Sequence, residues 1–129
     1  MDGWRALDVE LDAWAVSNRI ATFWWRDDDV THDGPALRRL LTLAVEAKIP
    51  LALAAIPADA RDDLVEVVGP MTGVVILQHG WDHRNHAMPS EKKAELARGR
   101  PWQTVVGELL RGQEVLSAMF PGRYMPVLV

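Results

Sequence analysis

Apolar residues alternate along the chain between helical spacing and short continuous runs. Over residues 3–17, tryptophan and leucine recur every three or four positions with acidic residues between them, which predicts an amphipathic helix that covers another surface. The runs LALAAI and VVILQ are typical of strands buried on both faces. A strand is also expected from Ile20 to about Arg26, and a fourth in the closing MPVLV.

Helices are predicted between these strands. They cover about 35–48 and 59–68, the second capped by Asp59, and a third starts at Pro101. A further short helix is expected in PSEKKAEL, where Ser90 can cap it and the charged residues form a solvated face. This alternation predicts an α/β fold of parallel strands with helical crossovers. Four strands cannot close a parallel barrel, so the sheet is open or the chain is the first half of a longer domain.

The composition limits what the chain can bind. Its 129 residues fit one domain, and its net charge of −4 argues against a general nucleic-acid binder and against anchoring to anionic membranes. Because there is no cysteine, any metal ion must be held by histidine, carboxylate or backbone oxygen. The acidic start does not resemble a secretory signal, and no apolar run approaches the roughly 18 residues of a membrane span, so a cytoplasmic location is expected.

Two polar clusters follow predicted strands. The first strand ends in RDDD, and the third leads into HGWDHRNH, which holds three of the chain's four histidines. Because ligand sites of parallel α/β folds lie at the carboxyl ends of the strands, both clusters should emerge on one rim of the sheet. His79 and His83 are four positions apart, so they form a half-site for zinc if the segment after Gly80 turns helically.

A carboxylate from residues 27–29 would complete a three-ligand site with one open position, the arrangement of catalytic zinc centres. A second carboxylate nearby could take a proton from water as general base. Taken alone, either cluster also fits a solvated surface; together at strand ends they favour a metal site. Trp81 can wall this site, stack on a sugar ring or pack the loop, and His86 is expected to contact substrate or to lie on the surface. Arg26 can pair with an aspartate, and His32 is expected in a turn.

At these residues the chain resembles the polysaccharide deacetylase family, the NodB-like carbohydrate esterases. That family's first motif is a strand ending in two aspartates, and its second is a strand followed by His-x-x-x-His. The counterparts here are RDDDV and HGWDH, in the same order. The resemblance implies an irregular (β/α) barrel and a divalent metal ion, which we expect to be zinc. It also implies hydrolysis of acetyl groups on a carbohydrate or a related small acylated amide.

The resemblance carries residue roles in two alternative registers. In the preferred one, Asp28 is the general base and Asp29 binds the metal. In the other, Asp27 is the base and Asp28 is the ligand. His79 and His83 are metal ligands in both. The preferred register is the one in which the arginine and valine that flank the motif also match divergent relatives.

The chain departs from the family at Val30, where the motif has glycine, and at Gly80, where it has serine or threonine. The family's later motifs, which include a final catalytic histidine, lie beyond its fourth strand. We therefore expect residues 1–129 to be a single domain that corresponds to the N-terminal half of the family's domain, truncated at its C-terminus. The leading hypothesis is a metal-dependent deacetylase-type hydrolase. The alternatives are a non-catalytic metal- or carbohydrate-binding relative, and an α/β scaffold without metal. The open sheet edge predicts self-association.

Overall fold

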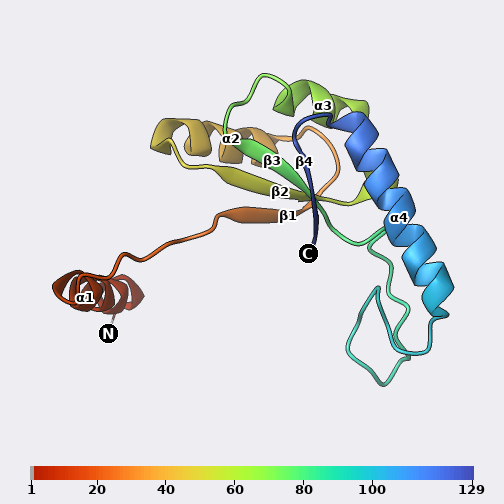
Figure 1. Cartoon of the computed structure of the whole chain (residues 1–129), viewed down its shortest axis with the longest axis horizontal. Helices are drawn as coiled ribbons and strands as arrows, with labels where there is room; N and C mark the ends of the chain where they lie inside the picture. Colours follow the sequence, from red (N-terminus) through yellow and green to blue (C-terminus); the bar gives the residue numbers. More distant parts are fainter. Residues whose placement is uncertain (1) are drawn as a thin grey trace.

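A computed structural model describes residues 2–129 of the chain, which fold around one parallel sheet (Figure 1). The four strands lie in the order β1-β2-β3-β4, and every neighbouring pair is parallel. This confirms the predicted α/β class with parallel strands and helical crossovers. The elements in chain order are α1 (Gly3–Val16), β1 (Arg26–Val30), α2 (Pro35–Ala47), β2 (Leu51–Ala55), the 3-10 turn η1 (Pro57–Asp59), α3 (Asp62–Val68), β3 (Val74–Gln78), α4 (Trp102–Met119) and β4 (Tyr124–Leu128).

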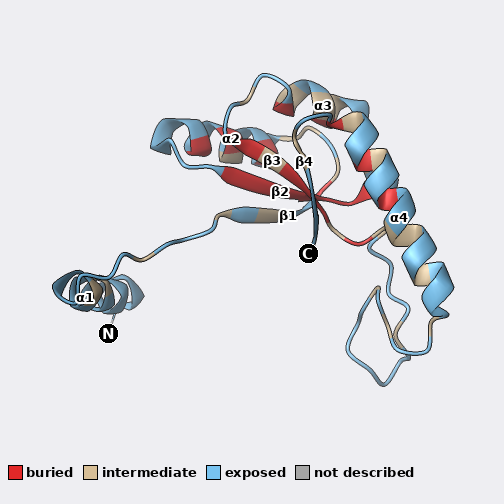
Figure 2. Ribbon diagram, in the orientation of Figure 1, coloured by how far each residue is buried: buried red, intermediate tan, exposed pale blue. Residues whose placement is uncertain are grey.

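The core lies between the sheet and the helices α2, α3 and α4. Alternate residues of β2 and β3 point toward these helices, as the two-residue repeat of a strand requires. Leu53 and Ile76 have no exposed surface, so truncating either to alanine should cost roughly 2–5 kcal/mol. Figure 2 shows how strongly burial is concentrated in β2 and β3. The main core cluster contains Leu41, Leu51, Leu53, Ala55, Leu64, Val74, Ile76 and Leu116.

The first strand differs from its prediction. It covers Arg26–Val30 rather than the aromatic run that starts at Ile20, and it contains the aspartates instead of ending before them. The physical reason is its place at the edge of the sheet, where a strand needs backbone pairing with one neighbour and can leave polar side chains in solvent. Phe23 and Trp24 are exposed, and Trp25 packs against the core cluster.

One predicted helix cap and one predicted helix were wrong, although α3 ends at Val68 as predicted. Asp59 does not cap the third helix, because it belongs to η1, and Arg61 takes the N-cap position of α3. The segment 89–96 forms turns rather than a helix. Within this loop, the Asn85 side chain accepts hydrogen bonds from the backbone N–H groups of Ala87 (3.1 Å) and Ala94 (2.9 Å). Such side-chain acceptors compete with the helical hydrogen-bond pattern.

The N-terminal helix α1 falls within its predicted range of 3–17, but among residues 2–129 it does not cover another surface as predicted. None of its residues is buried, and Figure 1 shows it standing apart from the sheet at the end of an extended segment. Most of its amphipathic stripe is therefore exposed, with Trp4 at 75% of its accessible surface, and Leu11 and Trp14 are half-buried. No helix within residues 2–129 is both long enough and apolar enough to span a bilayer.

Candidate metal centre

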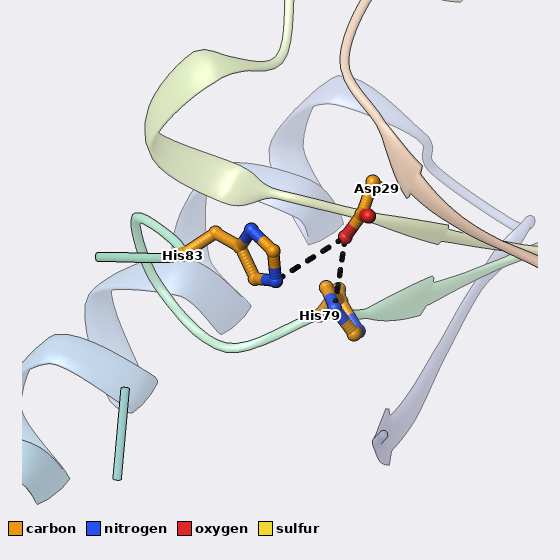
Figure 3. A group of neighbouring side chains, drawn as sticks. All are labelled: Asp29, His79 and His83. Carbon is orange, nitrogen blue, oxygen red and sulfur yellow. Dashed lines mark ion pairs between the residues drawn. The ribbon is translucent and has the colours of Figure 1, made fainter. Parts of the chain in front are cut away.

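The carboxyl ends of β1 and β3 flank the same end of β2, and three side chains from them face one another (Figure 3). Nε2 of His79 lies 3.0 Å from Oδ1 of Asp29, and Nε2 of His83 lies 3.4 Å from the same oxygen. The two imidazole centroids are 5.1 Å apart. Potential ligand atoms of all three residues lie within 4.8 Å of one another. The two polar clusters therefore meet on one rim, as the strand order requires.

A bulge in β1 sets the position of Asp29. Asp27 pairs with Leu53 and Val30 pairs with Ala55, so β1 uses three steps where β2 uses two. Asp29 absorbs the extra residue with φ of 63°, the left-handed region that few non-glycine residues adopt. Such a conformation costs of order 1–3 kcal/mol and persists only where surrounding structure enforces it. The bulge breaks the regular alternation of the strand just where the Asp29 side chain reaches the histidines.

The two histidines lie on different kinds of backbone, one at the end of a strand and the other on a loop. His79 directly follows β3, and its backbone N–H donates to the Ala55 carbonyl at 2.8 Å, which continues the ladder with β2. Its Nδ1 is buried and has no hydrogen-bond partner among residues 2–129, so the polar contact of the ring lies on the Nε2 side, toward Asp29. His83 lies on an irregular loop with φ of 55°. The expected helical turn after Gly80 is therefore wrong, although the rings converge.

The carboxylate of Glu95, predicted to lie on a solvated helix face, instead organises this loop. Glu95 accepts hydrogen bonds from the backbone N–H groups of three consecutive residues, 81–83. Gly80, with φ of 59°, lies against the same carboxylate. The glycine at position 80 is itself a sequence signal for this close approach, because glycine is the residue suited to a left-handed position without room for a Cβ.

The other two aspartates lie in different surroundings. Both oxygens of Asp28 contact the Arg26 guanidinium, with Oδ1 2.7 Å from Nε and Oδ2 3.0 Å from Nη2, so the expected pairing of Arg26 with an aspartate is present. Asp27 is half-buried. Burial, followed by the negative charges of Asp28 and Asp29, raises the pKa of Asp27 above its ordinary 3.8.

The remaining candidates lie outside this group of three. Trp81 is half-buried in the loop, and its ring centroid lies 5.5 Å from the Arg111 guanidinium carbon. His86 is exposed, and its backbone N–H donates to the Ala94 carbonyl. His32 makes a local contact between Nδ1 and the Thr31 hydroxyl at 2.8 Å, as expected of a turn residue.

The donor types, and the two distances from Asp29 to the histidines, fit a small divalent cation. Zinc–nitrogen and zinc–oxygen bonds of about 2.0–2.2 Å place ligand atoms roughly 3.4 Å apart in a tetrahedral site and about 3.0 Å apart in an octahedral one. The two distances from Asp29 Oδ1 to the imidazole nitrogens, 3.0 and 3.4 Å, fall in this range. Imidazole and carboxylate donors suit zinc and several neighbouring transition metals. The Asp29 and His83 side chains are 58% and 52% exposed, so the centre opens to solvent.

Comparisons with protein-family models, with curated proteins and with solved structures found no match for this chain. The resemblance to polysaccharide deacetylases therefore stays a prediction that depends on the two short motifs.

Proposed function

We propose that this chain is a metal-dependent hydrolase domain of the deacetylase type, which removes an acetyl group from a carbohydrate or a related small acylated amide. The observation that carries the proposal is the convergence of Asp29, His79 and His83 from two strand ends. These three residues would hold the cation, which we expect to be zinc. A bound divalent cation supplies Lewis acidity, which polarises an acyl carbonyl and lowers the pKa of water.

The adjacent aspartates supply the proton acceptor. In the preferred assignment this is Asp28, whose carboxylate is fixed in orientation by its two contacts with Arg26. Asp27 is the alternative base, as the other register of the motif implies. Trp81 and His86 are proposed to contact the substrate. The exposure of the centre is compatible with a long substrate such as a polysaccharide segment.

Metal binding is tested by isothermal titration calorimetry with Zn²⁺ and Co²⁺. We expect one site per chain, with a loss of affinity of at least 10- to 100-fold in His79→Ala, His83→Ala and Asp29→Ala. His86→Ala is the matched control, because it removes an imidazole from the same loop outside the group of three. Absence of binding by the unmodified protein, or an equal loss in His86→Ala, would overturn the metal assignment.

Turnover is tested separately, by release of acetate from acetylated sugar oligomers and small acetamides. Asp28→Asn is expected to keep metal affinity and lose at least 100-fold in kcat. If Asp27→Asn shows that pattern and Asp28→Asn does not, the alternative register of the base holds. Tight metal binding without acetate release would instead support the second candidate, a non-catalytic metal- or carbohydrate-binding relative.

A further inference from the structure

The loop after β3 encloses the carboxylate of Glu95. The Trp81 N–H donates to Oε1 at 2.6 Å, the Asp82 N–H donates to the same oxygen at 3.2 Å, and the His83 N–H donates to Oε2 at 3.0 Å. Consecutive backbone N–H groups that converge in this way form a concave anion-binding site. Here the anion is a side chain of the same protein, so the loop is fixed from inside.

Gly80 makes the enclosure possible. A Cβ added at this position would lie 2.1 Å from Oε2 of Glu95, well inside van der Waals contact, and φ is 59°. The loop can therefore close around the carboxylate only because position 80 has no side chain. His83, at the other end of the enclosed segment, is also left-handed, with φ of 55°. Its backbone conformation needs support from outside the residue itself.

Glu95 is itself anchored to α4. Nη1 of Arg100 donates to the Glu95 backbone carbonyl at 3.3 Å, and Nη2 of Arg100 contacts both oxygens of Glu108 in α4, at 2.8 and 2.9 Å. A continuous set of contacts thus runs from α4 through Arg100 and Glu95 to the backbone of His83. Both Glu95 oxygens are occupied by backbone N–H groups, so this carboxylate is placed to orient the loop rather than to bind metal.

We propose that Glu95 is a positioning residue of the candidate metal centre, because its carboxylate fixes the backbone of residues 81–83 and thereby directs the His83 imidazole toward Asp29. This inference rests on the proposed metal site. Partners that orient metal ligands from behind commonly change metal affinity by 10- to 100-fold when they are removed. The effect of Glu95 should therefore pass through His83 and not through His79, whose backbone is held by β2.

The first test is a pair of isosteric variants in one loop. Glu95→Gln replaces one acceptor oxygen by an amide that opposes the converging N–H groups, and we expect its Zn²⁺ affinity to fall 10- to 100-fold by calorimetry. Glu91→Gln is the matched control, because within residues 2–129 the Glu91 side chain accepts only from the Met88 N–H, at 3.3 Å, and its Zn²⁺ affinity should stay within about 2-fold of the unmodified protein. Glu95→Asp keeps the negative charge and tests the inference if Glu95→Gln does not fold. Its loss of Zn²⁺ affinity should be smaller than the loss expected for Glu95→Gln.

A double-mutant cycle separates positioning from general loss of stability. In the His83→Ala background, Glu95→Gln should change the remaining Zn²⁺ affinity by less than about 3-fold, because the residue it positions is gone. In the His79→Ala background it should retain its 10- to 100-fold effect. Equal effects in both backgrounds would overturn the positioning role.

A metal-free measurement distinguishes this inference from the proposed function. In ¹H–¹⁵N spectra recorded with chelator, Glu95→Gln should shift the amide signals of residues 81–83 and speed their hydrogen exchange, and Glu91→Gln should leave them unchanged. Unaltered amides in Glu95→Gln would overturn the inference whether or not metal binds. Altered amides in a protein that binds no metal would support the loop contact and reject the metal function instead.

Discussion

Two glycines of α4 predict opposite results for the same substitution. Gly112 is buried where α4 crosses the end of β3, and an added Cβ would lie 2.4 Å from Nε2 of Gln78 and 2.9 Å from Cγ of Pro57. At Gly107, on the exposed part of the same helix, such a Cβ would meet no described residue within 4 Å beyond its chain neighbours and the adjacent helix backbone. The perturbation is therefore alanine at each position, and Gly107→Ala is the matched control for Gly112→Ala.

The magnitudes follow from helix propensity and packing. Gly107→Ala should stabilise the protein by about 0.8–1.0 kcal/mol, because alanine loses less backbone entropy in a helix. Gly112→Ala gains the same amount, but overpacking costs about 1–3 kcal/mol. It also displaces the Gln78 amide, which donates to the Leu109 and Gly80 carbonyls at 2.9 and 3.0 Å. A buried donor left unpaired costs a further 1–3 kcal/mol, roughly, so the net loss is about 1–5 kcal/mol.

Urea unfolding followed by far-UV circular dichroism measures both variants against the unmodified protein. We expect the free energies of unfolding to move in opposite directions with unchanged m values. Because Gln78 also donates to the Gly80 carbonyl, at the start of the loop that carries His83, Gly112→Ala should weaken Zn²⁺ binding as well. A Gly112→Ala protein as stable as the unmodified one would refute the close packing of α4 on the end of β3.

Three further predictions follow from single contacts. The hydrogen bond from Arg38 lowers the pKa of Asp33 below its ordinary 3.8. The contact therefore stabilises the fold above about pH 4, and this stability is lost as pH falls through the lowered folded-state pKa. Asp33→Asn should remove this pH dependence from the free energy of unfolding measured in urea, and an unchanged pH profile would contradict the assignment. Gly80→Ala should lose at least 10-fold in Zn²⁺ affinity by calorimetry, whereas Gly99→Ala, with φ of 85° and nothing within 4 Å, should not. Because β4 is an edge strand with exposed apolar side chains, the chain should associate with a second copy as its concentration rises, as measured by sedimentation velocity. Val127→Lys should reduce this self-association, and a protein that stays monomeric would reject the prediction.

The buried elements are those that the sequence predicts best. LALAAI and VVILQ place β2 and β3 correctly because strands covered on both faces are nearly continuous apolar runs, and few other structures accept such a run. Pro35 marks the start of α2 as predicted, because proline suits the first turn of a helix. Local chemistry decides these boundaries, so local patterns reveal them.

The edge of the sheet is not predictable in this way. RDDDV has no apolar pattern, yet it forms β1 because its backbone pairs with β2. The more strand-like residues before it, such as Ile20 and Phe23, remain exposed. The register of pairing depends on where β2 ends, which is information from a distant part of the chain. A pattern read along one segment cannot contain it.

The rings of His79 and His83 converge, but not through the backbone geometry that was expected. His-x-x-x-His was expected to act through a helical turn, but the loop is irregular, and the rings converge through left-handed residues at positions 80 and 83. Asp29 is left-handed as well. Two of the three candidate ligands thus adopt left-handed backbone conformations that are uncommon for residues other than glycine. The bulge in β1 and the Glu95 carboxylate enforce these conformations from separate parts of the chain. If the cluster binds no metal, a substitution that removes the left-handed strain at Asp29 or His83 should stabilise the metal-free protein and cost no Zn²⁺ affinity. In a metal centre the same substitution would lower the Zn²⁺ affinity, and this difference separates a metal centre from a chance group of polar residues.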